Sequence, residues 1–145
     1  MQEFLGPLKI GFIKTLNLAV LLAKIIIPVT FFVTVLENTG LLQHIALFFH
    51  PALGVLGLPG EAALPLLLGF FINIYAAMGA IAVLSLSGQE VTVIALIILT
   101  SHSLLMEAPV LSFTGLGPLR SIPMRIGLGL LIGFLTHSAY SLLGG

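Results

Sequence analysis

Residues 16–36 read LNLAVLLAKIIIPVTFFVTVL, an apolar stretch that includes one charged residue, Lys24. A helix needs about 20 mostly apolar residues to cross a bilayer, and this stretch has that length. The apolar region of a cleavable signal peptide is shorter, about 7–15 residues, and no small-x-small cleavage site follows here. We therefore expect a retained transmembrane helix over Thr15–Leu36, ended by the polar residues of 37–40.

Outside this stretch, the chain repeats the same apolar character. Three more segments qualify as spans: Ala62–Leu86, Val91–Phe113 and Met124–Leu143. The segment Leu41–Leu58 is interrupted by Pro51 and Gly54, which indicates a short interfacial or re-entrant helix, with a fifth span as the alternative. No repeat or linker divides the chain. We predict one all-α transmembrane domain over residues 1–145, with about four spans and broken helices.

Composition supports the membrane class and narrows the function. Hydrophobic residues make up 59% of the chain and charged residues 7%, whereas a soluble domain carries about 25% charge. The net charge is zero and the basic residues are scattered, so we expect no nucleic-acid partner. Cysteine is absent, which removes disulfides and thiolate metal sites.

Enzyme signatures are missing from the sequence. It contains no P-loop, no G-x-G-x-x-G, no H-E-x-x-H and no G-x-S-x-G. It also contains no aspartate, which rules out an Asp-based triad or an aspartyl-phosphate intermediate. We predict that the protein is not an enzyme and uses no cofactor.

The strongest candidate for a functional residue is Glu107, an ionisable group well inside the predicted span Val91–Phe113. Such groups are costly in a membrane and usually face protein or water. At 100° per residue, Thr100, Ser103 and Glu107 share one face. Pro109 removes a backbone donor, so we expect the helix to be weakened beside the carboxylate. A broken helix with a carboxyl group is typical of transporter ligand sites; the alternative is a structural carboxylate bonded to a neighbouring helix.

Three other ionisable residues have competing interpretations. His102 lies on the opposite face of a regular helix and reaches Glu107 only if that helix is interrupted; otherwise it is structural. Lys24 extends to the headgroups or pairs with a carboxylate such as Glu107. His102, Glu107 and His137 contain the donors of an N/O metal site, but nothing fixes their spacing and we predict no metal.

Small residues form two helix faces. Close approach of membrane helices needs such faces, and a lone Asn on one of them hydrogen-bonds across helices. One face consists of Gly69, Asn73, Ala76, Ala77 and Ala80; the other consists of Gly129, Gly133, Thr136, His137 and Tyr140. We expect a packing role for His137, and we predict that Asn73 and Glu107 approach each other, in one chain or between two.

Five motifs occur in a recognisable order. They are Lys24-Ile25-x-x-Pro28, Gly57-Leu58-Pro59-Gly60-Glu61, Asn73-Ile74-Tyr75 with Gly79, Ser101-His102-Ser103-Leu104-x-x-Glu107, and Arg125. In this order and spacing the chain resembles the nucleoside-recognition, or Gate, family, over about Lys24 to Tyr140. That family includes spore maturation membrane proteins and the membrane modules of ferrous-iron transporters.

The resemblance implies a half-transporter that works in an inverted pair in the bacterial inner membrane. It implies a substrate site at Asn73, Tyr75, His102 and Glu107, to which the polar face of the third span adds Ser103. Three residues are expected in gating or structural roles: Lys24, Arg125 and His137. The absence of cysteine departs from the ferrous-iron modules and makes iron a poor candidate substrate.

We therefore predict a transporter, or half of one, for an ion or small polar solute, with a structural or assembly protein as the alternative. We also expect an antiparallel homodimer. With four spans, one side of the membrane holds Lys9 and Lys14, and the other holds Arg120 and Arg125. Orientation follows the Lys and Arg excess, so two against two allows insertion both ways.

Overall fold

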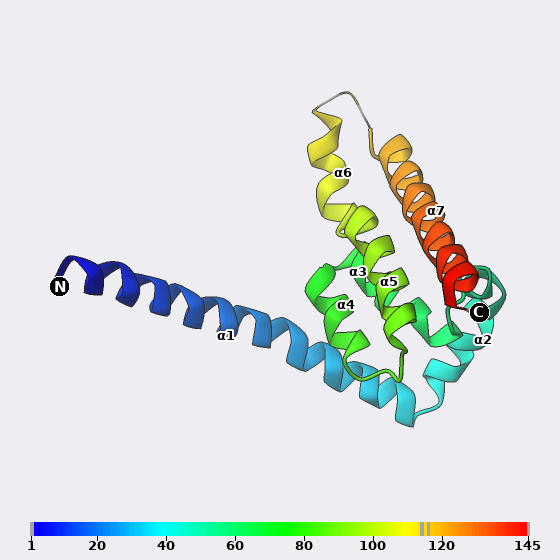
Figure 1. Ribbon diagram of the computed structural model, residues 1–145, viewed down its shortest axis with the longest axis horizontal. Helices are drawn as coiled ribbons and strands as arrows, with labels where there is room; N and C mark the ends of the chain where they lie inside the picture. Colours follow the sequence, from blue (N-terminus) through cyan, green and yellow to red (C-terminus); the bar gives the residue numbers. More distant parts are fainter. Residues whose placement is uncertain (1, 114, 116, 145) are drawn as a thin grey trace.

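The computed structural model describes residues 2–113, 115 and 117–144, and the regular secondary structure of these residues is helical. The first helix projects from a body formed by the others (Figure 1). The elements are α1 (Gln2–Asn38), α2 (Leu41–Gly54), a 3₁₀ turn η1 (Gly60–Ala62), α3 (Ala63–Phe71), α4 (Ile74–Ile81), α5 (Gly88–Ser101), α6 (Leu104–Ser112) and α7 (Pro118–Gly144). The predicted all-α class is confirmed.

Three helical stretches of the described residues are long and apolar enough to cross a membrane. They are Pro7–Asn38, Gly88–Glu107 and Pro118–Leu143. These stretches correspond to the first, third and fourth predicted spans, and the chain is a multi-pass membrane protein. The second predicted span is not among them, for a reason given below.

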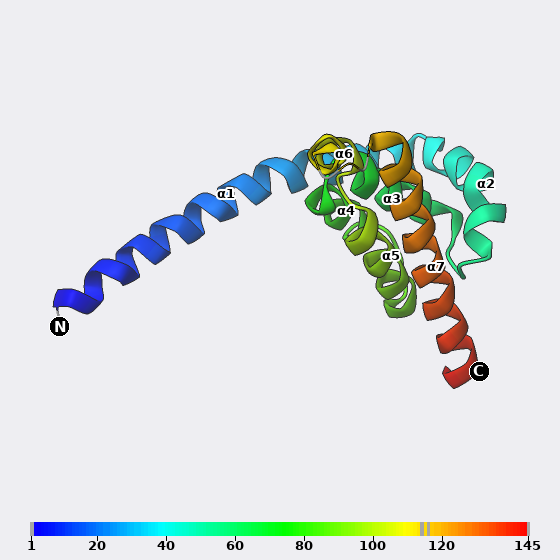
Figure 2. The same cartoon turned by 90° about the horizontal axis from the view of Figure 1, so that it is seen from above.

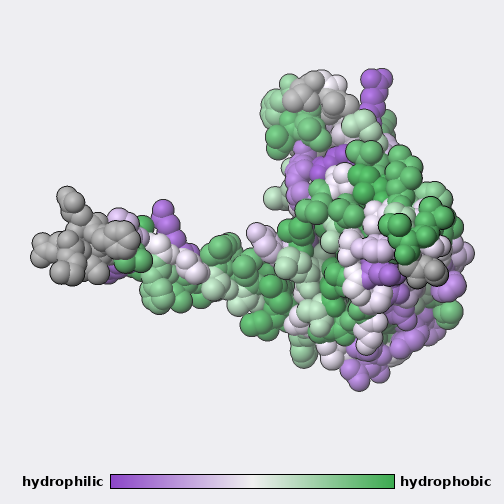
Figure 3. Space-filling model, viewed as in Figure 1, coloured by the Kyte–Doolittle hydropathy of each residue, from purple (hydrophilic) through white to green (hydrophobic). Residues whose placement is uncertain are grey.

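Helix α1 is a long arm, and much of it is exposed. Figures 1 and 2 both show its N-terminal part pointing away from the body, and residues 7–21 are exposed. Only the C-terminal part packs: Val33 and Leu36 are buried, and Gly79 of α4 lies close to the backbone of Ile26. The arm is apolar (Figure 3), as expected of a helix that faces lipid.

Helix α2 has 14 residues, about 21 Å at 1.5 Å per residue, which is too short to span a bilayer. The short-helix interpretation of Leu41–Leu58 is therefore confirmed, although the helix continues through Pro51. The glycines of the following Gly-Leu-Pro-Gly-Glu loop have steric roles. Gly57 has φ +65°, and a Cβ there would overlap the ring of His137; a Cβ at Gly60 would overlap the backbone of Ala46 in α2.

Residues 62–86 form a hairpin of α3 and α4 instead of the predicted continuous span. The chain turns at Ile72 and Asn73, where Asn73 has extended backbone (φ −171°, ψ 171°). The Leu68 carbonyl accepts hydrogen bonds from both turn amides, at 2.9 and 3.1 Å. The Asn73 side chain then starts α4 by accepting from the Ala76 amide at 2.9 Å, a standard N-cap. The prediction was wrong here because hydropathy does not reveal a reversal of direction.

The fold of α5 and α7 rests on close packing between antiparallel helices. A Cβ at Gly129 would come within 2.6 Å of the Ser101 hydroxyl, and one at Gly133 within 2.6 Å of the Ile97 side chain. The tight packing predicted from this glycine face is confirmed, as is the burial of Ala76, Ala77 and Ala80 on the other small-residue face. The main core lies between the hairpin, α2 and α5, with Ile94, Ile97 and Leu104 fully buried.

The hairpin changes the predicted topology. A polar cavity of about 240 Å³ is lined by residues from three connections: Glu37 and Gln43, Pro59 and Glu61, and 84–86 with Glu90. The segments 41–61 and 87–90 therefore lie at one end of the body, not on opposite sides as the four-span count required. Figure 3 shows hydrophilic side chains gathered at this lower end of the body.

Candidate functional site

The candidate site is built where the long helix of residues 88–112 is interrupted. Helix α5 ends at Ser101, His102 has extended backbone (φ −71°, ψ 158°), and α6 begins after Ser103. Ser103 has φ 49°, the one positive value among the non-glycine residues that the structure describes. The helix is therefore broken, as predicted, but five residues or more before Pro109, which lies inside α6.

This interruption is joined to the turn of the hairpin by one hydrogen bond. The Ser103 amide donates to the carbonyl of Gly69 at 2.9 Å, instead of to a carbonyl one turn back in its own helix. Gly69 lies against Ile98, where a Cβ would come within 3.0 Å, so the glycine permits this approach. The interruption of α5–α6 therefore lies beside the C-terminal part of α3, close to the turn of the hairpin.

Glu107 lies in the first turn of α6, where the helix dipole favours negative charge. Its Oε2 atom is 2.7 Å from Arg125 Nη1, and its Oε1 atom is 3.2 Å from His102 Nε2. His102 therefore reaches Glu107 across the interrupted helix, which was the alternative to a separate structural histidine on the opposite face. The alternative pairing of Glu107 with Lys24 is wrong: Lys24 is exposed on α1, and Arg125 supplies the counter-ion.

Arg125 holds the interruption together. Its Nε donates to the carbonyl of Thr100 at 3.1 Å, and its Nη2 donates to the carbonyl of His102 at 3.3 Å. These carbonyls belong to the end of α5, where no intrahelical donor is left. In return, the Ser101 hydroxyl donates to the backbone carbonyl of Arg125 at 2.7 Å. The guanidinium side chain is 16% exposed, so it acts as an internal clamp between α5, α6 and α7.

The His102 ring has an acceptor at each nitrogen. Nε2 faces the Glu107 carboxylate, and Nδ1 lies 3.3 Å from the carbonyl of Leu99. A neutral imidazole has one N–H and can donate to only one of these acceptors, whereas an imidazolium donates to both. The His102 side chain is 32% exposed and that of Glu107 41%, so both remain accessible from outside the chain.

The other predicted site residues lie around this cluster or apart from it. Asn73 is half-buried, and its oxygen is occupied by the α4 cap. The polar contacts of Glu107 among the described residues are with Arg125 and His102, so the predicted approach of Asn73 to Glu107 between two chains stays a prediction. Tyr75 is exposed at 40%. His137 lies against Gly57, away from Glu107, and the described residues contain no group of three or more ligands for a metal.

The sequence gives little indication of the groups that bond to the interrupted helix. Arg125 was considered as a residue for gating or structure, yet it makes three of the polar contacts. The carbonyls of Thr100, His102 and Gly69 carry no signal in the sequence at all. A charged residue two positions into an apolar span is the one clue to Arg125.

Comparison with known proteins identifies the family. The sequence matches the family described as nucleoside recognition, named Gate, over residues 19–117, which is more than half of the chain. The chain belongs to the Gate family. The match includes both helix interruptions and Glu107, and it ends before Arg125.

Two kinds of relative extend this Gate assignment. The chain is 38% identical over 125 residues to the uncharacterized membrane protein YvoD of Bacillus subtilis, a match that covers 86% of this chain and 39% of the relative. It is 31% identical over 70 residues to the Fe(2+) transporter FeoB of Legionella pneumophila, covering 48% and 9%. The chain thus spans about two fifths of the first relative and less of the second. No solved structure matches. The similarity indicates a membrane role related to transport.

Proposed function

We propose that this Gate protein is half of a membrane transporter, not an enzyme, that moves an ion or small polar solute past the cluster of His102, Glu107 and Arg125. One observation carries the proposal: the interrupted helix α5–α6 is bonded at Ser103 to Gly69 of the α3–α4 hairpin, beside ionisable side chains that stay partly exposed. Irregular backbone is tolerated at membrane depth only in protein or beside a water-filled cavity. Interrupted helices of this kind form the binding sites of secondary transporters.

The charges of the cluster restrict the substrate class. Glu107 and Arg125 neutralise each other at 2.7 Å, so a passing cation meets no uncompensated carboxylate. A solute with hydrogen-bonding groups can instead exchange contacts with the exposed edge of Glu107 and with His102. The Legionella relative is named as an Fe(2+) transporter, whereas the cluster in this chain offers no cysteine and no third metal ligand among the described residues.

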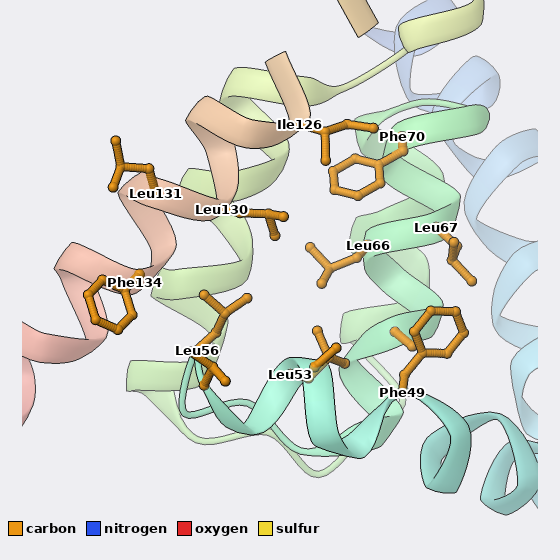
Figure 4. A pocket seen from close by; sticks show the side chains of 13 residues that line it. Phe49, Leu53, Leu56, Leu66, Leu67, Phe70, Ile126, Leu130, Leu131 and Phe134 are labelled. Atoms are coloured by element: carbon orange, nitrogen blue, oxygen red, sulfur yellow. The ribbon is translucent and has the colours of Figure 1, made fainter. Parts of the chain in front are cut away.

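In this proposal, a second half supplies the other wall of the transport pathway. A cavity of about 510 Å³ lies between α2, α3 and α7, and its wall consists of apolar side chains such as Leu66, Phe70 and Leu130 (Figure 4). It does not include Glu107, whose side chain is open to the surroundings of the chain. We therefore place the pathway at an interface with an inverted second half, in the bacterial inner membrane. The expected antiparallel homodimer is one form of that pair.

A structural or assembly protein without a transported substrate is the second candidate. The observation in its favour is that Arg125 connects three helices through contacts that are complete within one chain. In this case Glu107 stabilises the fold and is not a binding group. The two candidates differ in whether any solute crosses the membrane.

Uptake into proteoliposomes tests the proposal, with radiolabelled nucleosides and Fe²⁺ as the first probes. Glu107→Gln keeps the shape and hydrogen bonding of the side chain but removes its charge, so uptake should fall about tenfold or more, equivalent to about 1.4 kcal/mol. Glu37→Gln is the matched control, because Glu37 is exposed at the other end of the body, and it should transport normally.

Two results would contradict the proposed movement of a solute past Glu107. Normal uptake by folded Glu107→Gln would show that the carboxylate does not handle the solute. A wild-type protein that is folded and moves none of the probes, under pH or sodium gradients of either direction, would remove the support for transport.

A further inference from the structure

The basic residues of the chain are distributed unevenly along it. All five Lys and Arg residues lie before residue 25 or after residue 119, and the segment between has none. The three glutamates that line the polar cavity, Glu37, Glu61 and Glu90, belong to that basic-free segment. The described fold decides how this pattern is placed across a membrane.

The hairpin places the connections near residues 37–43, 59–61 and 84–90 at one end. Both ends of the hairpin, the start of α5 and the end of α1 contribute to the same polar cavity. Helix α7 runs antiparallel to α5, because Gly129 faces Ser101 and Gly133 faces Ile97. Its first turn, with the exposed Arg120, therefore lies at the opposite end of the body.

A membrane-crossing α1 would bring two more charges to the side that holds Arg120. Helix α1 finishes at the basic-free end, and Lys9 lies about 43 Å before that point along a helix with 1.5 Å rise per residue. This length exceeds the hydrocarbon core of a bilayer, about 30 Å. When α1 crosses the membrane, Lys9 and Lys14 reach the side of Arg120. Lys24 stays within the span, and Arg125 is paired with Glu107.

We infer that the chain inserts in one orientation, with Lys9, Lys14 and Arg120 in the cytoplasm and the Glu37–Glu61–Glu90 end outside. Orientation follows the Lys and Arg bias of short loops and span ends, and acidic residues contribute little. One side of the membrane then has Lys9, Lys14 and Arg120 outside the spans, and the other side has no Lys or Arg. The four-span count had given two basic residues on each side. The changed charge count comes entirely from the hairpin, because α3 and α4 return the chain to the side of the membrane from which it entered.

This orientation restricts the partner, a consequence that rests on the proposed function. Copies that all insert the same way cannot form the inverted pair. The inverted half is then a different sequence, about as large as this chain, with its basic residues at the opposite end relative to its own interrupted helices. The Bacillus relative has room for such a unit, because 61% of its length lies outside the match.

Cysteine accessibility tests the inference in the full chain, which has no cysteine of its own. Gln89→Cys marks the basic-free end and Gly117→Cys marks the other; Gln89 is exposed, and a Cβ at Gly117 meets no neighbour. Intact bacterial cells are treated with a membrane-impermeant maleimide. Labelling of Gln89→Cys should exceed that of Gly117→Cys about tenfold, and the difference should vanish after permeabilisation.

A charge variant makes the test sharper. Lys9→Gln, Lys14→Gln and Arg120→Gln together should remove the bias, so that both cysteines become labelled in intact cells. Lys24→Gln is the control and should leave the labelling pattern unchanged. Comparable labelling of the two positions in the wild-type background would overturn the inference and restore the antiparallel homodimer. That result would not change the outcome of the uptake experiment with Glu107→Gln, so the proposed orientation and the proposed transport function are tested independently.

Discussion

Helix α1 and the helices α5 and α6 show opposite responses to similar sequences. Both segments are long and apolar, and α1 contains Pro7 and Pro28, yet α1 stays helical throughout. The other segment breaks at His102 and Ser103, where it contains neither proline nor glycine. Proline removes a backbone donor, but it does not decide where these helices are interrupted.

The difference between the two regions lies in what the backbone can bond to. Residues 7–21 of α1 are exposed, so in lipid their backbone groups depend on intrahelical hydrogen bonds. Around Ser103, by contrast, the Gly69 carbonyl and the Arg125 guanidinium supply replacement partners. A membrane helix breaks where its neighbours satisfy the freed groups, and three variants test this.

Arg125→Gln should have the largest effect on the interrupted region. It leaves the Glu107 carboxylate without its counter-ion and two α5 carbonyls without their donor. We expect the free energy of unfolding to fall by about 2–3 kcal/mol, less than for a fully buried pair because Glu107 is partly exposed. Unfolding in detergent micelles measures this. Lys24→Gln on α1 should change stability by no more than about 0.5 kcal/mol.

A double variant separates two contributions to this loss of stability: the carboxylate without its counter-ion and the carbonyls without their donor. If the loss comes mainly from the stranded carboxylate, Glu107→Gln should restore part of the stability of Arg125→Gln. An unchanged stability in Arg125→Gln would contradict the role of Arg125 as the clamp, and the interruption would need another explanation.

Gly129→Ala should have an intermediate effect. The added methyl group would press on the Ser101 hydroxyl and the Ile97 carbonyl, which separates α7 from the end of α5. We expect a loss of about 1–2 kcal/mol, typical of overpacking. Gly127→Ala is a matched control in the same helix, because a Cβ there meets nothing within 4 Å. Equal stabilities of the two variants would show that close packing of α5 and α7 is dispensable.

Asn73→Ala should have the smallest effect of the three. It removes the side-chain cap of α4 but keeps the turn of the hairpin, so we expect a loss of about 1 kcal/mol. Asn73→Ser retains an N-cap acceptor and should recover most of it. A full loss in the serine variant would indicate that Asn73 has a partner beyond Ala76, as the predicted contact with Glu107 of another chain requires.

The sequence allowed some of these features to be predicted and hid others. Length and hydropathy predicted the three long helices, and the spacing of glycines predicted close packing of α7, although not that α5 is its partner. The hairpin was hidden because residues 62–86 are mostly apolar, and the mean hydropathy of such a segment is the same whether it crosses the membrane or turns back. The position of the break was hidden because its partners are carbonyls, which every residue has. Glu107 was identifiable as a charge in an apolar span, but its partner Arg125 was assigned through resemblance.

The location of Arg125 on α7 has a consequence for how related sequences change. The family match ends at residue 117, while the carboxylate inside it depends on a guanidinium outside it. Evolution at the two positions should therefore be coupled: relatives that keep an acid at 107 should keep an arginine one-third of the way along their last helix, and those that lose one should lose both. Covariation between positions 107 and 125 would link a residue inside the family match to one beyond its end at residue 117.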